Sequence, residues 1–194
     1  MIIKRGHFCE NASGVSSFGK YLDEVEKNDD FTKIRKENKK ITVFLSHNNN
    51  DIADIKETVG VIEMLENYGA KIYIDCTDDI SPNNIGNAAY RIKQKIQNCH
   101  KFILLATENA IESKWCNWEL GIGDACKCID NIAILPLIEE WKSDNQYVGN
   151  DYLLVYPSIY FKKSSNQKRD NSFYYIKYPN SNKIVKLDAW LKQN

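Results

Sequence analysis

Residues 41–51 read Ile-Thr-Val-Phe-Leu-Ser-His-Asn-Asn-Asn-Asp, and this stretch decides the fold class. Its first five residues are apolar or β-branched and do not alternate with polar ones, which predicts a strand buried on both faces. The polar residues from Ser46 to Asp51 predict the loop at the carboxyl end of that strand. A strand buried on both faces needs helices on both sides, which favours a parallel sheet of the α/β class.

Three further short apolar runs follow, and segments with helical spacing of apolar residues separate them. The predicted strands are 41–45, 71–74, 101–106 and 131–135, the last ended by Pro136, and the predicted helices are 52–68, 85–98 and 114–128. Gly69 is a natural C-cap of the first helix, and Ser113 is an N-cap of the third. The alternation predicts a doubly wound sheet, in which ligands bind outside the carboxyl ends of the strands.

The segments on either side of this pattern are less regular. We divide the chain into an N-terminal extension, residues 1–39, and a domain over residues 40–194. A stripe at Phe18, Leu22 and Val25 predicts that the extension is partly helical. Residues 141–194 are rich in tyrosine and predict an irregular segment with a short terminal helix, which we expect to cover an edge of the sheet.

Charge and composition exclude some classes of protein. Lys and Arg together number 26, as do Asp and Glu, so the formal net charge is zero, which argues against binding to nucleic acid by bulk charge. No apolar run is long enough to span a bilayer, and the N-terminus lacks the apolar region of a signal peptide. We therefore expect a cytoplasmic protein that binds neither nucleic acid nor membrane, with its six cysteines as free thiols.

Motifs for bound cofactors and metals are missing. The loop 46–51 contains no glycine, so the dinucleotide-binding G-x-G-x-x-G does not follow the first strand, and the chain has no P-loop, H-E-x-x-H or C-x-x-C. We expect no bound cofactor and no metal site. The only G-x-G, at 121–123, lies in a helical pattern and is interpreted as close packing between helices. An open alternative is a nucleophilic thiol at Cys116, with His47 or His100 as its base.

The remaining constellation is Trp-Cys-Asn-Trp-Glu-Leu at residues 115–120. Trp115 and Glu119 are four residues apart and so share one face of a helix that begins at the carboxyl edge of the sheet. A carboxylate beside an aromatic ring at a cleft can be partly desolvated and aimed at a ligand. From the spacing of these residues alone, a surface glutamate next to a core tryptophan is the favoured interpretation, and a ligand-binding carboxylate is the alternative.

Taken together, Val43–His47, Tyr73–Asp75 and Ser113–Leu120 resemble the TIR (Toll/interleukin-1 receptor) domain in its bacterial, NAD+-consuming form, over roughly residues 40–140. The resemblance implies a flavodoxin-like parallel sheet. Because bacterial and plant members often cleave NAD+ at the nicotinamide–ribose bond, it also implies an NAD+ glycohydrolase or cyclase, with NAD+ as substrate. Glu119 matches the catalytic glutamate of the family. The residues implied to bind substrate are Ser46, His47, Asn50, Asp75 and Trp115.

The resemblance also implies products and partners. Attack by water gives nicotinamide and ADP-ribose, and attack by a hydroxyl of the same molecule gives a cyclic ADP-ribose isomer. Self-association through TIR–TIR contacts is implied, as is a separate effector that senses the product within a bacterial antiphage defence system. The alternative is a non-enzymatic TIR adaptor or scaffold that acts by TIR–TIR association. Such adaptors commonly lack the glutamate that this chain has at position 119.

Overall fold

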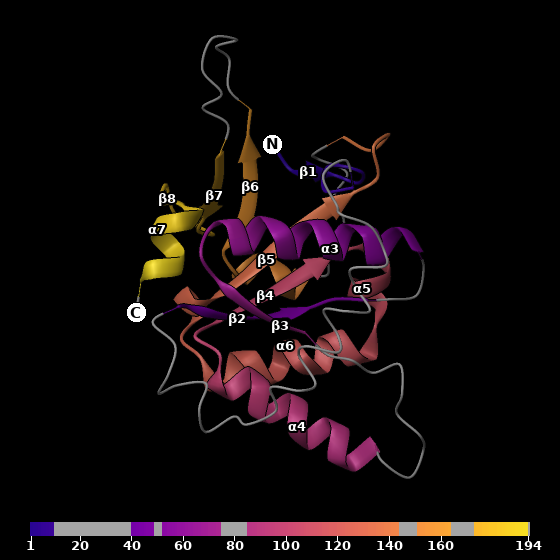
Figure 1. The fold of residues 1–194 in the computed structure, drawn as a ribbon. Helices are drawn as coiled ribbons and strands as arrows, with labels where there is room; N and C mark the ends of the chain where they lie inside the picture. The colour runs from indigo at the N-terminus through magenta and orange to yellow at the C-terminus, as the bar shows by residue number, and fades with distance from the viewer. Residues whose placement is uncertain (10–39, 49–51, 75–84, 144–150, 164–172, 194) are drawn as a thin grey trace.

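The computed structural model describes residues 1–9, 40–48, 52–74, 85–143, 151–163 and 173–193. Its centre is an eight-stranded sheet with the order β3-β2-β4-β5-β6-β7-β8, in which β1 also pairs with β5 (Figure 1). The strands are β1 (Ile3–Lys4), β2 (Thr42–Ser46), β3 (Lys71–Ile74), β4 (Lys101–Ala106), β5 (Ile132–Ile138), β6 (Ser158–Lys162), β7 (Phe173–Lys177) and β8 (Ile184–Lys186). The α-helices are α3 (Ile52–Asn67), α4 (Ile85–Asn98), α5 (Glu108–Glu112), α6 (Lys114–Cys126) and α7 (Leu187–Lys192).

The parallel core of the sheet matches the prediction. Strand β2 lies between β3 and β4, with Phe44 opposite both Tyr73 and Phe102, and β4 pairs in turn with β5. All residues of β2, β4 and β5 are buried, as expected for strands covered on both faces. The α/β class and the flavodoxin-like arrangement of a TIR fold are confirmed.

Helices cover both faces of this core. Figure 1 shows α3 on one face and α4 and α6 on the other, with the N-terminus near β1 and the C-terminus beside α7. The apolar side chains accordingly form two clusters. One lies around α3 and includes Leu65 and Trp190, and the other lies around α4 and α6 and includes Phe102 and Leu120.

Local signals at the ends of helices also behave as predicted. Ser113 caps α6, and its hydroxyl accepts the backbone N–H of Cys116 at 3.3 Å. Gly69 follows α3 with a φ of +84°, a backbone conformation that glycine adopts at little cost. The interpretation of Gly123 is wrong in one respect: a Cβ there would meet the ring of Phe102 at 3.1 Å, so it packs against β4 rather than against another helix.

The end of one strand and the presence of one short helix differ from the sequence prediction. Pro136 does not end β5, which continues to Ile138. The reason is that β4 ends at Ala106, opposite Pro136, and β1 then pairs with β5 at Leu137 and Ile138. The short helix α5 was not predicted; Thr107 caps it by accepting the N–H of Ala110 at 3.2 Å.

The C-terminal segment is more regular than expected. Strands β6, β7 and β8 extend the sheet, and β7 and β8 run antiparallel to their neighbours. The terminal helix α7 was predicted, whereas the segment that we expected to cover a sheet edge instead adds three strands to the sheet. Lys101, 1% exposed, anchors α7: its ammonium lies 4.7 Å from the centroid of the Trp190 ring and donates to Asn131 Oδ1 at 2.5 Å.

Residues 1–9, which we name the N-terminal strap, join the sheet. Strand β1 runs parallel to β5, and the Phe161 N–H donates to the carbonyl of Met1 at 3.3 Å, so the strap lies between β5 and β6. The Gly6 N–H donates to the Glu57 carboxylate on α3. Burial raises the pKa of Glu57 above its ordinary value, an effect that the Gly6 bond partly offsets. The helix predicted around Phe18 lies outside the described residues.

Candidate functional site

A buried polar pair lies where β2 meets α6. Ser46 is the last residue of β2, and Glu119 lies in the second turn of α6, on the side of the helix that faces the sheet. The Ser46 hydroxyl donates to Glu119 Oε2 at 2.5 Å. Ser46 is fully buried and Glu119 is 1% exposed. The predicted catalytic residue and one predicted substrate-binding residue are thus in direct contact.

This arrangement is costly for the fold. A carboxylate removed from water loses solvation worth several kcal/mol unless hydrogen bonds replace it. A short hydroxyl-to-carboxylate bond recovers part of that cost and fixes the orientation of the Glu119 side chain. A buried, oriented carboxylate at the carboxyl edge of a parallel sheet is a typical feature of functional sites in doubly wound folds.

His47 and Cys116 also meet here, through the backbone of His47. The Cys116 thiol donates to the backbone carbonyl of His47 at 3.2 Å, and both residues are buried. His100 hydrogen-bonds with Thr42, the first residue of β2, so it lies at the opposite edge of the sheet. The interpretation of His100 as a base for Cys116 is therefore wrong, and the contact with His47 holds the loop after β2 against α6.

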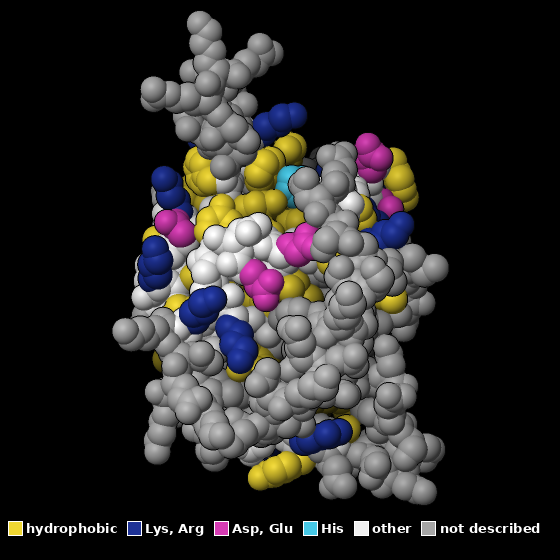
Figure 2. Space-filling view, in the orientation of Figure 1, with side chains coloured by type: hydrophobic (Ala, Val, Ile, Leu, Met, Phe, Trp, Pro, Cys, Tyr) yellow, Lys and Arg dark blue, Asp and Glu magenta, His cyan; other side chains and the backbone are white. Residues whose placement is uncertain are grey.

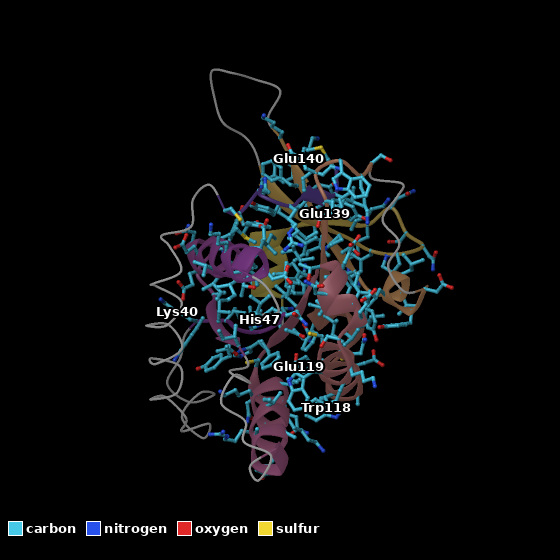
Figure 3. All side chains as sticks on the ribbon, turned by 90° about the vertical axis from the view of Figure 1, so that its right-hand side faces the viewer. Lys40, His47, Trp118, Glu119, Glu139 and Glu140 are labelled. Carbon is cyan, nitrogen blue, oxygen red and sulfur yellow. The ribbon has the colours of Figure 1, made fainter. Side chains whose placement is uncertain are left out.

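The aromatic residues of α6 lie towards its outer side. The Trp115 and Trp118 rings are 4.9 Å apart, Trp115 packs against the core cluster of α4 and α6, and Trp118 is 37% exposed. Figure 3 labels His47 and Glu119 near the centre of the view, with Trp118 below them on α6. Asn50 and Asp75, the other predicted substrate-binding residues, lie outside the described residues.

A second polar network at the same edge was not predicted. Asp54, in the first turn of α3, is fully buried, and its two carboxylate oxygens accept from Arg5 at 2.7 Å and from Asn109 Nδ2 at 2.8 Å. Asn48 Nδ2 donates to the Asn109 carbonyl at 3.5 Å, and Arg5 also reaches Glu139 at 3.2 Å. A helical pattern shows a polar residue on an apolar face but not its partners, so the sequence carried no signal for this network.

Two of the cavities among the described residues lie away from the Ser46–Glu119 pair. The larger, about 830 Å³, lies between the strap, α3 and the β6–β7 pair and is lined by His7, Tyr68 and Tyr174 among others. Figure 2 shows hydrophobic side chains gathered on the upper part of the face that is turned to the viewer. The smaller cavity, about 490 Å³, lies beside Tyr156 and Tyr178. Glu119 lines neither of them.

Neither a metal-binding cluster nor a membrane-spanning helix is present in the described part of the chain. It contains no group of three or more His, Cys, Asp or Glu side chains arranged to hold a metal ion. In the same ranges, none of the helices has both the length and the apolar character required to cross a bilayer.

Comparison with known proteins agrees with the fold. The family model described as "TIR domain" matches residues 43–172, about two thirds of the chain, including β2 with Ser46 and α6 with Glu119. No curated protein matches the chain significantly. The sheet order, the helices on both faces and this match together show that the chain belongs to the TIR domain family.

Proposed function

We propose that this TIR domain protein cleaves NAD+ at the nicotinamide–ribose bond, with Glu119 as the catalytic residue. The observation that carries the proposal is the contact between Glu119 and Ser46: a buried carboxylate oriented by a hydroxyl at the carboxyl edge of the sheet. Family membership supports it, because NAD+ hydrolysis is compatible with a TIR domain. The pair is suited to one task, the stabilisation of positive charge on a bound substrate.

A single carboxylate is sufficient for this reaction. Ordinary glycosidases need a second carboxyl group because the leaving alkoxide must be protonated. Nicotinamide leaves NAD+ as a neutral molecule, so no general acid is required. The carboxylate of Glu119 stabilises the ribosyl oxocarbenium ion and orients its hydroxyls. Water then gives ADP-ribose, or a hydroxyl of the same molecule gives a cyclic isomer.

The burial of Glu119 adds a condition to this proposal. A side chain that is 1% exposed does not meet a substrate without local rearrangement. TIR domains commonly self-associate, and we propose that assembly opens the site, so that the isolated protein is weakly active and concentrated or assembled protein is strongly active. In this proposal the protein works in the cytoplasm, in an antiphage defence system, and a separate effector senses its product.

The second candidate function is a non-enzymatic scaffold. The observation that favours it is a set of exposed aromatic and aliphatic side chains around α6 and the turn at 151–155, namely Trp118, Tyr152, Leu154 and Val155. The Tyr152 hydroxyl donates to Asn117 Oδ1 and so ties this turn to α6. Such a surface suits TIR–TIR contacts whether or not the protein has enzymatic activity.

The test is the release of nicotinamide from NAD+ by concentrated protein, with products separated by chromatography and identified by mass spectrometry. Glu119→Gln keeps the size of the side chain and an oxygen that accepts from Ser46, so we expect an unchanged melting temperature and a loss of turnover of at least about a hundredfold. The matched control is Glu112→Gln, at an exposed glutamate on α5, which we expect to leave turnover unchanged. Equal turnover by Glu119→Gln and the wild type would remove Glu119 from the reaction.

A further inference from the structure

The N-terminal strap contacts several of the loops that form the carboxyl edge of the sheet. The Arg5 N–H donates to the Ile138 carbonyl at 2.7 Å, and the Lys4 ammonium donates to the Lys142 carbonyl, so the strap holds the segment after β5. The Arg5 guanidinium also reaches Glu139, in the same segment, and Asp54, at the start of α3. In Figure 3 Glu139 lies on the same side of the view as His47 and Glu119, above them.

The contacts continue from Arg5 towards the candidate site. The Asp54 carboxylate accepts hydrogen bonds from both Arg5 and Asn109. Asn109 is the second residue of α5, the short helix that follows β4. The Asn109 carbonyl accepts from Asn48, which is two residues after Ser46 and next to His47. Three consecutive hydrogen bonds thus connect the strap to the residues that follow Ser46.

Burial makes Asp54, in the middle of this chain of contacts, dependent on Arg5. Asp54 is fully buried, so its negative charge needs a cation, and Arg5 supplies one through a charge-assisted hydrogen bond at 2.7 Å. The carboxylate then has a fixed position and holds the Asn109 side chain at 2.8 Å. Arg5 lies 38 residues before the region that matches the TIR family model, so the family match does not account for it.

We propose that Arg5 is a positioning residue for the candidate site: through Asp54 and Asn109 it fixes the end of β2 at Ser46 and the residues that follow it, His47 and Asn48. The inference depends on the proposed function only for its activity readout. The strap therefore contributes to the site although it lies outside the matched region, and a molecule that displaced it would loosen the loop without contacting Glu119.

The first experiment is hydrogen exchange of the whole chain, comparing the wild type with Arg5→Ala at a temperature where both are folded. We expect exchange of the amides in 43–48 and 107–112 to speed up about tenfold or more, and exchange in helix α4, at 92–98, to stay unchanged. The matched control is Arg91→Ala, at an exposed arginine on α4, which should leave 43–48 and 107–112 as protected as in the wild type. Unchanged exchange at 43–48, or an equal rise in the reference helix, would overturn the proposal.

Two further variants keep the test decisive if Arg5→Ala folds poorly. Asn109→Ala leaves the Arg5–Asp54 pair in place and breaks the bond from Asp54 to α5, so it should loosen 107–112 and, through Asn48, 43–48. In the double variant Arg5→Ala/Asp54→Asn, no buried charge is left without a partner, and global stability should recover while 43–48 stays loose. Protection of 43–48 equal to the wild type in Asn109→Ala and in the double variant would refute the role of this network.

Activity gives an independent readout that a purely structural role would not produce. In Arg5→Ala we expect kcat/KM for NAD+ to fall about tenfold to a hundredfold, mainly through kcat, because the Ser46–Glu119 pair is misplaced. Guanidinium ion at a non-denaturing concentration should partly restore both kcat and the protection of 43–48 in Arg5→Ala, but not in Asn109→Ala. If the wild type does not cleave NAD+, the proposed function fails, and the exchange data still decide the role of Arg5.

Discussion

Gly60 of α3 gives the sharpest test of where the strap lies. A Cβ added at this position would fall 2.3 Å from the carbonyl oxygen of Phe8 and 2.6 Å from its Cβ, so Gly60→Ala must displace the strap. Displacement exposes the Phe8 side chain, which is only 3% exposed in the folded protein, and lowers the free energy of unfolding by about 1.5–3 kcal/mol. It also breaks the bond from Gly6 to the buried Glu57 carboxylate, at about 1.5–3 kcal/mol. Alanine regains about 1 kcal/mol of helix propensity, so we expect a net loss of roughly 2–5 kcal/mol.

The matched control is Gly121→Ala in α6, where a Cβ would meet nothing within 4 Å. Only the propensity term applies there, so this variant should gain about 0.5–1 kcal/mol in the free energy of unfolding. Urea denaturation followed by tryptophan fluorescence measures both variants. Opposite signs are expected for the same substitution in two helices. A gain in stability for Gly60→Ala would refute the packing of Phe8 on α3 and, with it, the position of the strap.

Two further predictions concern buried polar groups. Ser46→Ala removes one donor to the Glu119 carboxylate, so we expect a loss of about 1.5–3 kcal/mol in urea denaturation and reduced NAD+ cleavage; a stability equal to that of the wild type would contradict the contact. Burial lowers the pKa of Lys101 from 10.5 to about 8, so between these pH values the unfolded chain binds more protons than the folded one. The Lys101 contribution to stability should therefore rise from pH 8 to 10.5, and Lys101→Met should show a smaller rise over that range; parallel curves would argue against a buried ammonium.

The parallel core could be predicted because its signals are local. Four short apolar runs separated by helical spacings are enough to define strands covered on both faces, and Ser113 and Gly69 mark helix ends by their own chemistry. Strand β1 could not be predicted, because two residues carry no periodicity and their partner lies in β5. The strands at 158–162 and 173–177 were missed because most of their side chains, the tyrosines included, are only half-buried, so the contrast between apolar and polar positions is small.

Part of the candidate site could likewise be predicted from the sequence, and part of it could not. Glu119 was recognisable from its motif, and its contact with Ser46 follows from the edge of the sheet at which β2 ends and α6 begins. The Arg5–Asp54–Asn109 network was not recognisable, because each partner comes from a different element and no spacing relates them. The role of Cys116 as a nucleophile was open in the sequence, and the contact of its thiol with the His47 carbonyl shows a side chain that holds a loop in place.

The pairing of strap and sheet has a consequence for synthesis of the chain. Arg5 and its partner Glu139 are 134 residues apart. At about 5–20 residues per second, the ribosome makes the second partner roughly 7–27 s after the first. During that time Ile2 and Ile3, both buried in the finished protein, have no β5 to pair with. Residues 1–9 therefore dock only after β5 has been made, and the carboxyl edge on which the strap lies is completed at that point.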